Sequence, residues 1–455
     1  MCLRRWGTIG LIVVSAAAVC TLGSTPARAQ LGGVDVDAKG QLKTFKVDDP
    51  DGSLTRQRMR EALAALNPDV ARRSNVRKIS LGRLEAALRK RLDEGRGASD
   101  EMKYLAGLTR IQYVFYYPDT KDIVIAGPAE GWATVAPGRV IGLHTGRATL
   151  ELQDLVVALR VFQPGSKQRG TVFCSIDPTQ EGLARLNQYL RANRPLPNQR
   201  SADRFVAGMR ESLGLHNVRV GGVPTDTHMA QVLVEADYRM KLIGLGIEQP
   251  AVPLKSYVDL ANVAAIARNA MQRWFFVPDY QCLRMSEDGL AMQLVGDGVK
   301  LINADEVVRE DGTRAKAGTP NRGSELFTQG FTKMYGRLAD KTPIFAQLRN
   351  TIDLLVAAAF IQEQDYYGKA GWRMETFGDE KVFAVRTYQE PRVVDAAARA
   401  VFKGNRLATP IGGGVHIRPR DALKADSLLE DDGKASAQRS RIDLGKLAAD
   451  RWWWD

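Results

Sequence analysis

Histidine is the first residue type to consider for chemistry, because an imidazole binds metal ions and exchanges protons near neutral pH. The four histidines show no His-Glu-x-x-His motif and no close pair; they are His144, His216, His228 and His416. The nearest cluster, Asp226-Thr-His228, is interpreted as the beginning of a helix rather than as a pair of metal ligands. The sequence therefore predicts no metal site.

Motifs for phosphate binding and acyl transfer are also missing from the sequence. There is neither a Gly-x-x-x-x-Gly-Lys loop nor a Gly-x-Ser-x-Gly nucleophile elbow. The run Gly412-Gly-Gly414 could offer backbone amides to an anion, but no helix is expected after it and a flexible turn is the preferred interpretation. No cofactor is predicted.

Two pairs of carboxylates lie close enough in sequence to suggest general acid–base chemistry. Exported enzymes that cut glycans need two carboxyl groups about 5 to 9.5 Å apart. Asp177 and Glu181 are expected at the start of one helix, where capping and the helix dipole explain both. Glu235 and Asp237 are two residues apart in a predicted helix, so they point to different faces. The sequence therefore assigns no catalytic residue.

The first thirty residues predict a secretory signal peptide. Arg4 and Arg5 precede an apolar run from Thr8 to Leu22, and the small-residue pattern Ala27-Arg28-Ala29 follows. An uncleaved membrane anchor is disfavoured because the run is short, and a lipid anchor on Cys20 is disfavoured because of the preceding valine. We expect cleavage near Ala29, a periplasmic or extracellular location, and no transmembrane helix in the mature chain.

Removal of residues 1–29 changes both the cysteine count and the charge. Only Cys174 and Cys282 are left, and an oxidising compartment favours one disulfide between them over two buried thiols. The removed segment contains three arginines and no acidic residue, so the formal net charge falls from +12 to +9. Eight of those nine net charges lie between residues 54 and 92.

This basic segment is the strongest asymmetry in the composition. Its arginines and lysines create a positive field that attracts anionic surfaces and weakens with salt. We predict as candidate anion-binding residues Arg56, Arg58, Arg60, Arg72, Arg73, Arg77, Arg89, Lys90 and Arg91. The expected partner outside the cytoplasm is an anionic envelope polymer or another envelope protein, not nucleic acid. The alternatives are a solvated helical face or a face that docks on acidic groups of the same chain.

The elements that would position these residues follow from hydrophobic periodicity. The 455-residue chain is 44% hydrophobic and 25% charged, a composition typical of globular proteins. Helical spacing predicts helices over 54–66 and 80–95, and a hairpin over 111–126 follows them. Helices and strands then alternate as far as residue 242, which indicates an α/β layer.

Beyond residue 250 the pattern changes to short strands separated by turns. Strand-like runs between residues 274 and 303 predict an antiparallel meander, and Thr342-Pro343 precedes a long buried helix. The predicted fold is α/β, becoming α+β in the second half. The predicted divisions are a signal peptide (1–29), a lead with the basic helical pair (30–98), an α/β domain (99–250), an α+β domain (251–420) and a polar tail (421–455).

The tail ends in Arg451-Trp-Trp-Trp-Asp455. Three adjacent indole rings can serve as an aromatic anchor for a partner, or the tail can pack back on the core. The sequence leaves both interpretations open.

Several stretches resemble an uncharacterised family of exported bacterial proteins, known only as a domain of unknown function. They are Met102-Lys-Tyr-Leu-Ala-Gly-Leu-Thr109, Tyr117-Pro-Asp-Thr120 with Ile125-Ala-Gly-Pro-Ala-Glu-Gly-Trp132, Cys174-Ser-Ile-Asp-Pro-Thr-Gln-Glu-Gly182 and Val232-Leu-Val-Glu-Ala-Asp-Tyr-Arg-Met-Lys241. The resemblance covers residues 80 to 390 and implies export and a shared fold. It implies no activity and no functional residue.

Two functions are consistent with these observations. The leading hypothesis is a non-catalytic exported protein that binds or scaffolds at the cell envelope through its basic N-terminal module. The alternative is an extracytoplasmic hydrolase whose carboxylates come from separate loops. An open cleft that holds two facing carboxylates would favour the hydrolase, and acids spread over a convex surface would favour the binding protein.

Overall fold

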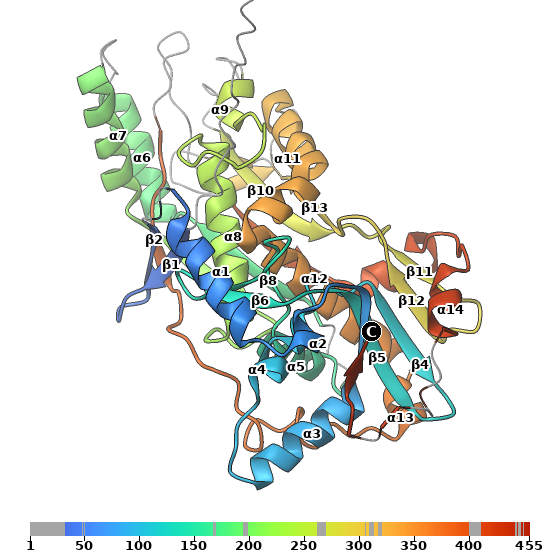
Figure 1. Cartoon of the computed structure of the whole chain (residues 1–455). Helices are drawn as coiled ribbons and strands as arrows, with labels where there is room; N and C mark the ends of the chain where they lie inside the picture. Colours follow the sequence, from blue (N-terminus) through green and yellow to red (C-terminus); the bar gives the residue numbers. More distant parts are fainter. Residues whose placement is uncertain are drawn as a thin grey trace, which may run out of the picture.

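The computed structural model places the chain around two β-sheets with helices packed between and around them (Figure 1). It describes residues 32–399 and 411–455, apart from gaps at 48, 50, 167–169, 194–198, 262–269, 305, 309–313, 317–320, 442–443, 445–446 and 449. The predicted signal peptide lies outside the described residues. The fold is mixed α/β, as the sequence predicts.

The larger sheet takes its strands from both halves of the chain. Among the described residues it has ten strands, in the order β1-β2-β16-β9-β8-β17-β10-β14-β15, with β13 also paired to β10. Their bounds are β1 Gly32–Val36, β2 Gln41–Lys46, β8 Val172–Asp177, β9 Leu215–Gly221, β10 Ala270–Pro278, β13 Val299–Asn303, β14 Glu306–Val308, β15 Arg314–Lys316, β16 Val393–Asp395 and β17 Ile411–Ile417.

The triple glycine lies inside this sheet rather than in a turn. Gly412, Gly413 and Gly414 belong to β17, which pairs with β10 on one side and β8 on the other. Gly413 has a φ of 128°, and any side chain there would collide with the backbone of Trp274. Glycine is therefore required for close backbone approach, and the turn interpretation is wrong.

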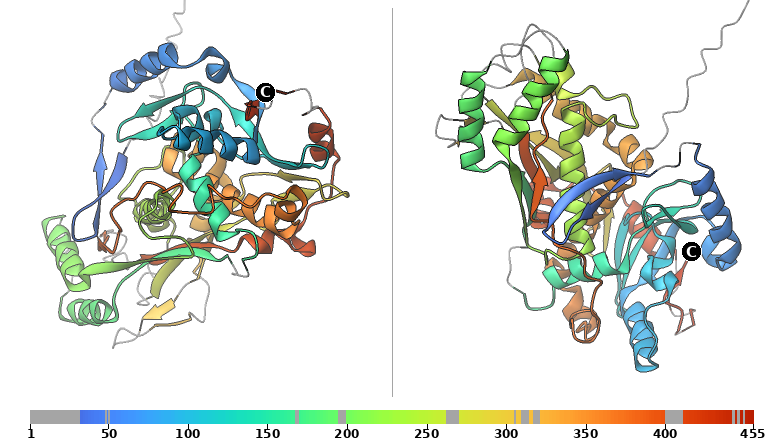
Figure 2. Two further views of the ribbon diagram at one scale, coloured as in Figure 1. Left: turned by 90° about the horizontal axis from the view of Figure 1, so that it is seen from below. Right: turned by 90° about the vertical axis from the view of Figure 1, so that its left-hand side faces the viewer.

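Two long helices form the centre of the molecule. They are α8 (His228–Gly244) and α12 (Pro343–Glu363), and α8 is seen end-on near the middle of the left view of Figure 2. Helix α12 begins after Thr342, as predicted. It is long and apolar enough to cross a membrane, but its most apolar window is completely buried inside the protein. It is the predicted buried helix.

The smaller sheet has six strands among the described residues, in the order β11-β12-β4-β5-β3-β18. The predicted hairpin is present as β4 and β5, and the antiparallel strands predicted beyond residue 270 are divided between the two sheets. Strands β10 and β13 pair in the larger sheet, whereas the β11–β12 hairpin pairs with β4. The bounds are β3 Ser74–Ser80, β4 Tyr113–Tyr117, β5 Asp122–Ala129, β11 Leu283–Met285, β12 Ala291–Leu294 and β18 Trp453–Trp454.

The carboxyl-terminal tail packs back onto this sheet. Strand β18 pairs with β3 through Trp453 opposite Ile79 and Trp454 opposite Lys78. All three terminal tryptophans are buried. Of the two interpretations of the tryptophan cluster, the structure therefore supports packing on the core.

The remaining elements surround the sheets. The basic segment forms α1 (Ser53–Ala65), α2 (Pro68–Ala71), β3 and α3 (Leu81–Asp93). A two-stranded sheet consists of β6 (Trp132–Val135) and β7 (Arg139–Gly142). The other helices include α4 Asp100–Lys103, α5 Leu152–Val161, α6 Gln180–Ala192, α7 Gln199–Leu213, α9 Tyr257–Leu260, α11 Arg322–Lys341, α13 Tyr366–Ala370 and α14 Lys434–Arg439.

The predicted disulfide is absent. Cys174 and Cys282 are both free and buried. Cys174 lies in β8 opposite Val415 of the larger sheet, whereas Cys282 directly precedes β11 of the smaller sheet. Their positions in different sheets explain the failure of the prediction. Burial raises the pKa of both thiols, to about 12 for Cys282, so neither is a thiolate near neutral pH.

Candidate functional site

The predicted anion-binding residues do not form one surface. Helix α1 packs on β6, whereas α3 packs on β3 and β5; the two helices occupy separate parts of the molecule in Figure 1. Several of the basic side chains already have partners: Arg89 pairs with Asp93 at 2.9 Å, and Arg91 donates to the Gly97 carbonyl at 2.8 Å. The remaining candidates, among them Arg58, Arg60, Arg73 and Lys90, lie on these helices or the short segment between them.

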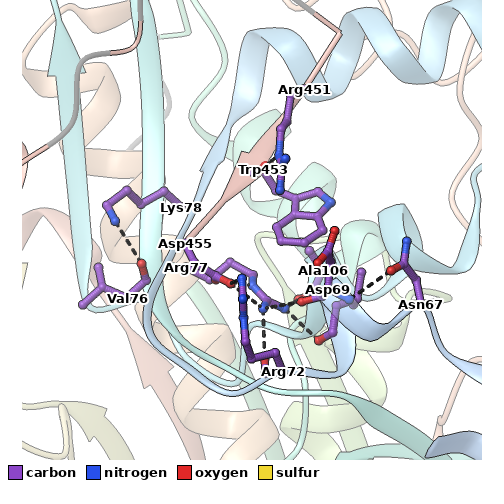
Figure 3. A network of polar contacts seen from close by, with 11 residues as sticks. Asn67, Asp69, Arg72, Val76, Arg77, Lys78, Ala106, Arg451, Trp453 and Asp455 are labelled. Carbon is purple, nitrogen blue, oxygen red and sulfur yellow. Dashed lines mark hydrogen bonds and ion pairs between the residues drawn. The ribbon is translucent and has the colours of Figure 1, made fainter. Parts of the chain in front are cut away.

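Arg77 is the most deeply buried of the predicted anion-binding residues, and it binds Asp455 of the same chain (Figure 3). Its side chain is 0% exposed. Nε donates to Asp455 Oδ1 at 2.7 Å and one terminal nitrogen donates to Asp455 Oδ2 at 3.1 Å. Trp453 covers the guanidinium, whose carbon lies 4.6 Å from the ring centroid.

The Arg77 guanidinium also donates hydrogen bonds to backbone carbonyls. It donates to the carbonyl oxygens of Val70, Ala106, Asp69 and Arg72 at 2.7–3.2 Å. Arg72 adds a longer contact of 3.4 Å to Asp455. Arg77 is therefore a structural residue that fastens the tail, and its assignment as an anion-binding residue for an external partner is wrong. We call Arg77, Trp453 and Asp455 the tail clasp.

A cavity of about 610 Å³ lies elsewhere, between β1, the β6–β7 turn, the start of α5, the first two turns of α8 and residues 383–388. This volume is within the range of small-molecule sites, about 300–1,000 Å³. Polar side chains from five segments meet there; they include Arg139, Glu151, His228, Glu235, Gln347 and Tyr388.

His228 lies between two carboxylates at the wall of this cavity. Its Nδ1 is 2.8 Å from Asp154 Oδ2, and its Nε2 is 3.8 Å from Glu151 Oε1. The first distance is a hydrogen bond, and the second is too long for one. Tyr388 packs against the imidazole with ring centroids 5.9 Å apart.

The protonation of His228 follows from these neighbours. Burial disfavours the imidazolium, but the charges of Asp154 and Glu151 and the hydrogen bond that Nδ1 donates to Asp154 outweigh it. They raise the pKa of His228 to about 9, with Arg139 opposing. The imidazole is therefore protonated at neutral pH and can donate a proton into the cavity.

Glu151 is oriented by its own neighbours. Its Oε2 accepts from Gln153 Nε2 at 2.6 Å, and the same amide group donates to the Tyr388 hydroxyl at 3.1 Å. Burial raises the pKa of Tyr104 and Tyr388, and the negative charge of Glu151 adds to both shifts. Two neutral phenols thus lie within the electrostatic reach of this carboxylate.

A second carboxylate, Glu235, is held on α8 by an arginine. Arg139 from β7 donates to Glu235 and also to the side chain of Gln347. Arg239 lies 3.6 Å from the same Glu235 oxygen but is mainly paired with Glu248. Glu235 is 6% exposed and Arg139 is 10% exposed, so this is a buried ion pair at the cavity wall.

Helix geometry explains why these side chains meet. His228 begins α8 after the N-cap Thr227, whose hydroxyl accepts from Ala230 N at 3.2 Å. Glu235 follows two turns later on the same face. Glu151 is the N-cap residue of α5 and Asp154 lies in its first turn. The sequence carried a signal for this face, the stripe His228, Gln231, Val232 and Glu235, which sequence reasoning missed.

The predicted carboxylate pairs are separated in the structure. Glu235 faces Arg139, whereas Asp237 is buried against Lys241 at 2.7 Å, so the prediction of different faces is confirmed. Asp177 ends β8 and pairs with Arg273 at 3.0 Å, while Thr179 is the actual N-cap of α6. The predicted capping role of Asp177 is wrong, because the helix begins two residues later than expected.

Comparison with known proteins identifies one family. Residues 174–257 match the profile of a protein of unknown function (DUF1598). This stretch runs from β8 to the start of α9 and supplies His228 and Glu235 to the cavity. The match confirms the resemblance to an uncharacterised family. No curated protein and no solved structure matches the chain.

Proposed function

We propose that the chain is an exported hydrolase whose cavity carries out acid–base chemistry. The observation that supports this most directly is the imidazole of His228 placed between Asp154 and Glu151 at the wall of a cavity. Export rests on the predicted signal peptide. The proposal is the alternative of the two functions considered for the sequence. Two facing carboxylates were expected to favour it, whereas the cavity brings one carboxylate, Glu151, to an imidazole and pairs the other, Glu235, with Arg139.

The proposed step adds water across a carbon–oxygen single bond. Glu151 accepts a proton from a water molecule that enters the cavity beside its carboxylate, and the water oxygen forms a bond to the electrophilic carbon. The bond from that carbon to the leaving oxygen breaks, and its electron pair stays on the oxygen. The His228 imidazolium donates its Nε2 proton to that oxygen. Transfer of the proton from Glu151 to His228 restores the starting state.

Asp154 has a positioning role in this step. Asp154 Oδ2 accepts a hydrogen bond from Nδ1, which fixes the imidazole ring, and its charge stabilises the imidazolium; Nε2 lies 3.4 Å from Gln347 Nε2 at the cavity wall. Arg139 forms an ion pair with Glu235, a second carboxylate at the wall. Each charged group that the step uses is therefore held by a contact within the protein.

Glu151→Gln tests the proposal. We expect the mature chain, residues 30–455, to hydrolyse at least one class in a panel of chromogenic nitrophenyl carboxylic esters and glycosides. The substitution removes the base, so the rate should fall at least about 100-fold. Glu61→Gln, on the exposed face of α1, is the matched control and should keep the full rate. Absence of turnover with every class, or full activity of Glu151→Gln, would contradict the proposal.

Binding to an anionic envelope polymer is a second candidate function, and one feature of α1 supports it. No residue of this helix is buried, and Arg56, Arg60 and Leu63, which is 52% exposed, follow one another along its outer face. The outer face of α1 is therefore the part of the predicted basic module that can contact a partner as one continuous surface.

Double substitution of Arg56 and Arg60 by glutamine tests this second function. Each arginine contributes to binding through its charge, so we expect weaker retention on an immobilised acidic polysaccharide at low salt, eluted earlier in a salt gradient. Arg89→Gln with Arg91→Gln on α3 removes equal charge from a different face and serves as the control. Equal loss from both pairs would indicate an effect of net charge alone and would contradict a specific role of α1.

A further inference from the structure

We infer that Gln347 is a positioning residue for His228, because its side-chain amide presents an N–H group to the imidazole nitrogen that transfers the proton. The inference rests on the proposed function and adds a residue on which the step depends. Three observations carry it: the contacts of the amide, the donor character of the arginine beside it, and the burial of both in the cavity wall.

Gln347 reaches the cavity from the buried helix α12. It lies in the second turn of this helix, is 6% exposed and lines the cavity. Its side chain has two hydrogen-bonding neighbours among the described residues. Oε1 accepts from Arg139, and Nε2 lies 3.4 Å from His228 Nε2, at the long end of hydrogen bonding. Buried polar atoms need partners, so these two contacts determine how the amide lies.

The orientation of this amide is determined by Arg139. A guanidinium can only donate hydrogen bonds, and this one also donates to Glu235, which holds it in place. The side-chain oxygen of Gln347 must therefore face Arg139, because the reversed amide would bring two donors together. The NH2 group is then the part of the amide that faces His228.

This NH2 group distinguishes the two protonation states of the imidazole. Nδ1 keeps its proton in both states, because it donates to Asp154 at 2.8 Å. In the neutral imidazole, Nε2 has a lone pair that accepts from Gln347. In the imidazolium, Nε2 carries a proton that points at another donor. Gln347 therefore favours the state that His228 reaches after it has given up its proton.

The groups around the imidazole oppose one another. The charged and titratable side chains at the cavity come from every element that packs there; they are Lys103 and Tyr104 beside α4, Arg139 on β7, Glu151 and Asp154 on α5, Glu235 on α8, and Arg386 and Tyr388 in the segment 383–388. The two carboxylates of α5 favour the imidazolium, and Arg139 disfavours it. Gln347 acts in the same direction as Arg139 without adding a charge. His228 is thus protonated before the step and releases its proton readily.

The contact changes in a defined way during the proposed step. The N–H bond at Nε2 breaks, and its proton goes to the leaving oxygen. The electron pair left on Nε2 then accepts a hydrogen bond from Gln347 until the proton returns from Glu151. Gln347 forms and breaks no covalent bond and acts through His228, so it is a positioning residue.

Titration of His228 by nuclear magnetic resonance tests the inference without any substrate. The nitrogen signals of the imidazole in the isotope-labelled mature chain are followed from about pH 6 to about pH 11, and His228→Asn identifies them. Gln347→Met removes the amide donor, so the midpoint of the titration should rise by about one pH unit. An unchanged or lower midpoint would overturn the inference.

Two further variants accompany this titration. Gln231→Met is the matched control, because Gln231 lines the same cavity but directs its Nε2 to the Gln389 carbonyl at 3.5 Å. It makes the cavity less polar to the same degree, and its midpoint should stay at the wild-type value. Gln347→Glu keeps an acceptor for Arg139 and replaces the NH2 group with an oxygen. Its midpoint should rise further than that of Gln347→Met, and a midpoint at or below the wild-type value would count against the inference.

The hydrolysis rate provides a readout that a merely structural residue would not change. With a nitrophenyl substrate that the mature chain cleaves, Gln347→Met should lower kcat about three- to tenfold, because a weaker acid protonates the leaving oxygen more slowly. KM should stay the same, and the alkaline limb of the pH profile should move up together with the midpoint. A fall in kcat with an unmoved alkaline limb would show a structural role only and overturn the inference.

The inference and the proposed function fail in different ways. A raised midpoint of Gln347→Met in a chain that cleaves no substrate would support the role of Gln347 at His228 and contradict the hydrolase. Cleavage that depends on Glu151, with the same midpoint in Gln347→Met and in the wild type, would support the hydrolase and overturn the inference.

Discussion

Replacing Arg77 with methionine is expected to lower the free energy of unfolding by about 3 kcal/mol. The guanidinium is completely buried and donates to two oxygens of Asp455 and to four backbone carbonyls. Methionine fills a similar volume but leaves these acceptors without donors. Because the side chain of Asp455 is 22% exposed, water rehydrates part of its charge and the loss stays near the lower end for buried pairs.

The free energy of unfolding is measured by urea denaturation with tryptophan fluorescence as the signal. Trp453 is an internal reporter of the tail clasp. Arg73→Met is the matched control, since Arg73 is a neighbouring exposed arginine, and its midpoint should stay at the wild-type value. A midpoint of Arg77→Met that equals the control would show that the tail clasp contributes nothing. Asp455→Asn should reproduce part of the loss, because an amide keeps one acceptor and loses the charge.

Acid should weaken the tail clasp in the wild type. Burial raises the pKa of Asp455, but the hydrogen bond and charge of Arg77 outweigh it, so the pKa lies below its usual range. For a carboxyl group with a lowered folded pKa, the contribution to stability is complete above the unfolded pKa and is lost as pH falls through the folded value.

Replacing His228 with asparagine is expected to reduce hydrolysis by about 100- to 10,000-fold, the range for loss of a general acid or base. Asparagine keeps a hydrogen-bond donor for Asp154 and cannot exchange a proton. The KM should change far less than kcat, because the lost interaction acts on the leaving oxygen. His144→Asn, outside the cavity, is the matched control. A rate for His228→Asn within a factor of three of wild type would exclude the imidazole from the step.

The pH dependence of the hydrolysis rate is a second test of the role of His228. With a pKa of about 9, His228 stays protonated through neutral pH, so the wild-type rate should fall as pH rises through about 9. The stability that the imidazolium contributes follows the same direction. It is complete below the unfolded pKa of about 6.5 and is lost as pH rises through about 9, because the folded pKa is the higher one. Asp154→Asn should move both transitions to lower pH.

The elements of the fold that depend on local patterns could be predicted from the sequence. Helical spacing located α1 and α3, and β-branched and aromatic residues located the β4–β5 hairpin. The division of strands between two sheets could not be predicted, since β10 and β12 have similar short apolar patterns and differ only in their distant partners. The predicted disulfide is absent for the same reason: the sequence does not show that its two cysteines belong to different sheets.

The candidate site could be predicted only in part. Glu235 was separated correctly from Asp237 by helix geometry, but its partner Arg139 is 96 residues away in the chain. The position of His228 at the beginning of a helix was predicted correctly. Its contact with Asp154 could not be predicted, because the two residues are 74 positions apart in the chain. The assignment of Arg77 failed because charge counting cannot distinguish an arginine on a surface from one enclosed by Trp453 and backbone carbonyls.

The tail clasp also has a consequence for the order in which the molecule folds. Arg77 and Asp455 are 378 residues apart, and β18 is the edge strand next to β3. In a chain that emerges from its amino end, β3 is present long before the residues that cover its outer edge. Until they arrive, that edge has unpaired backbone groups and Arg77 has no counter-ion. Pairing of β18 with β3 is therefore a late event of high contact order.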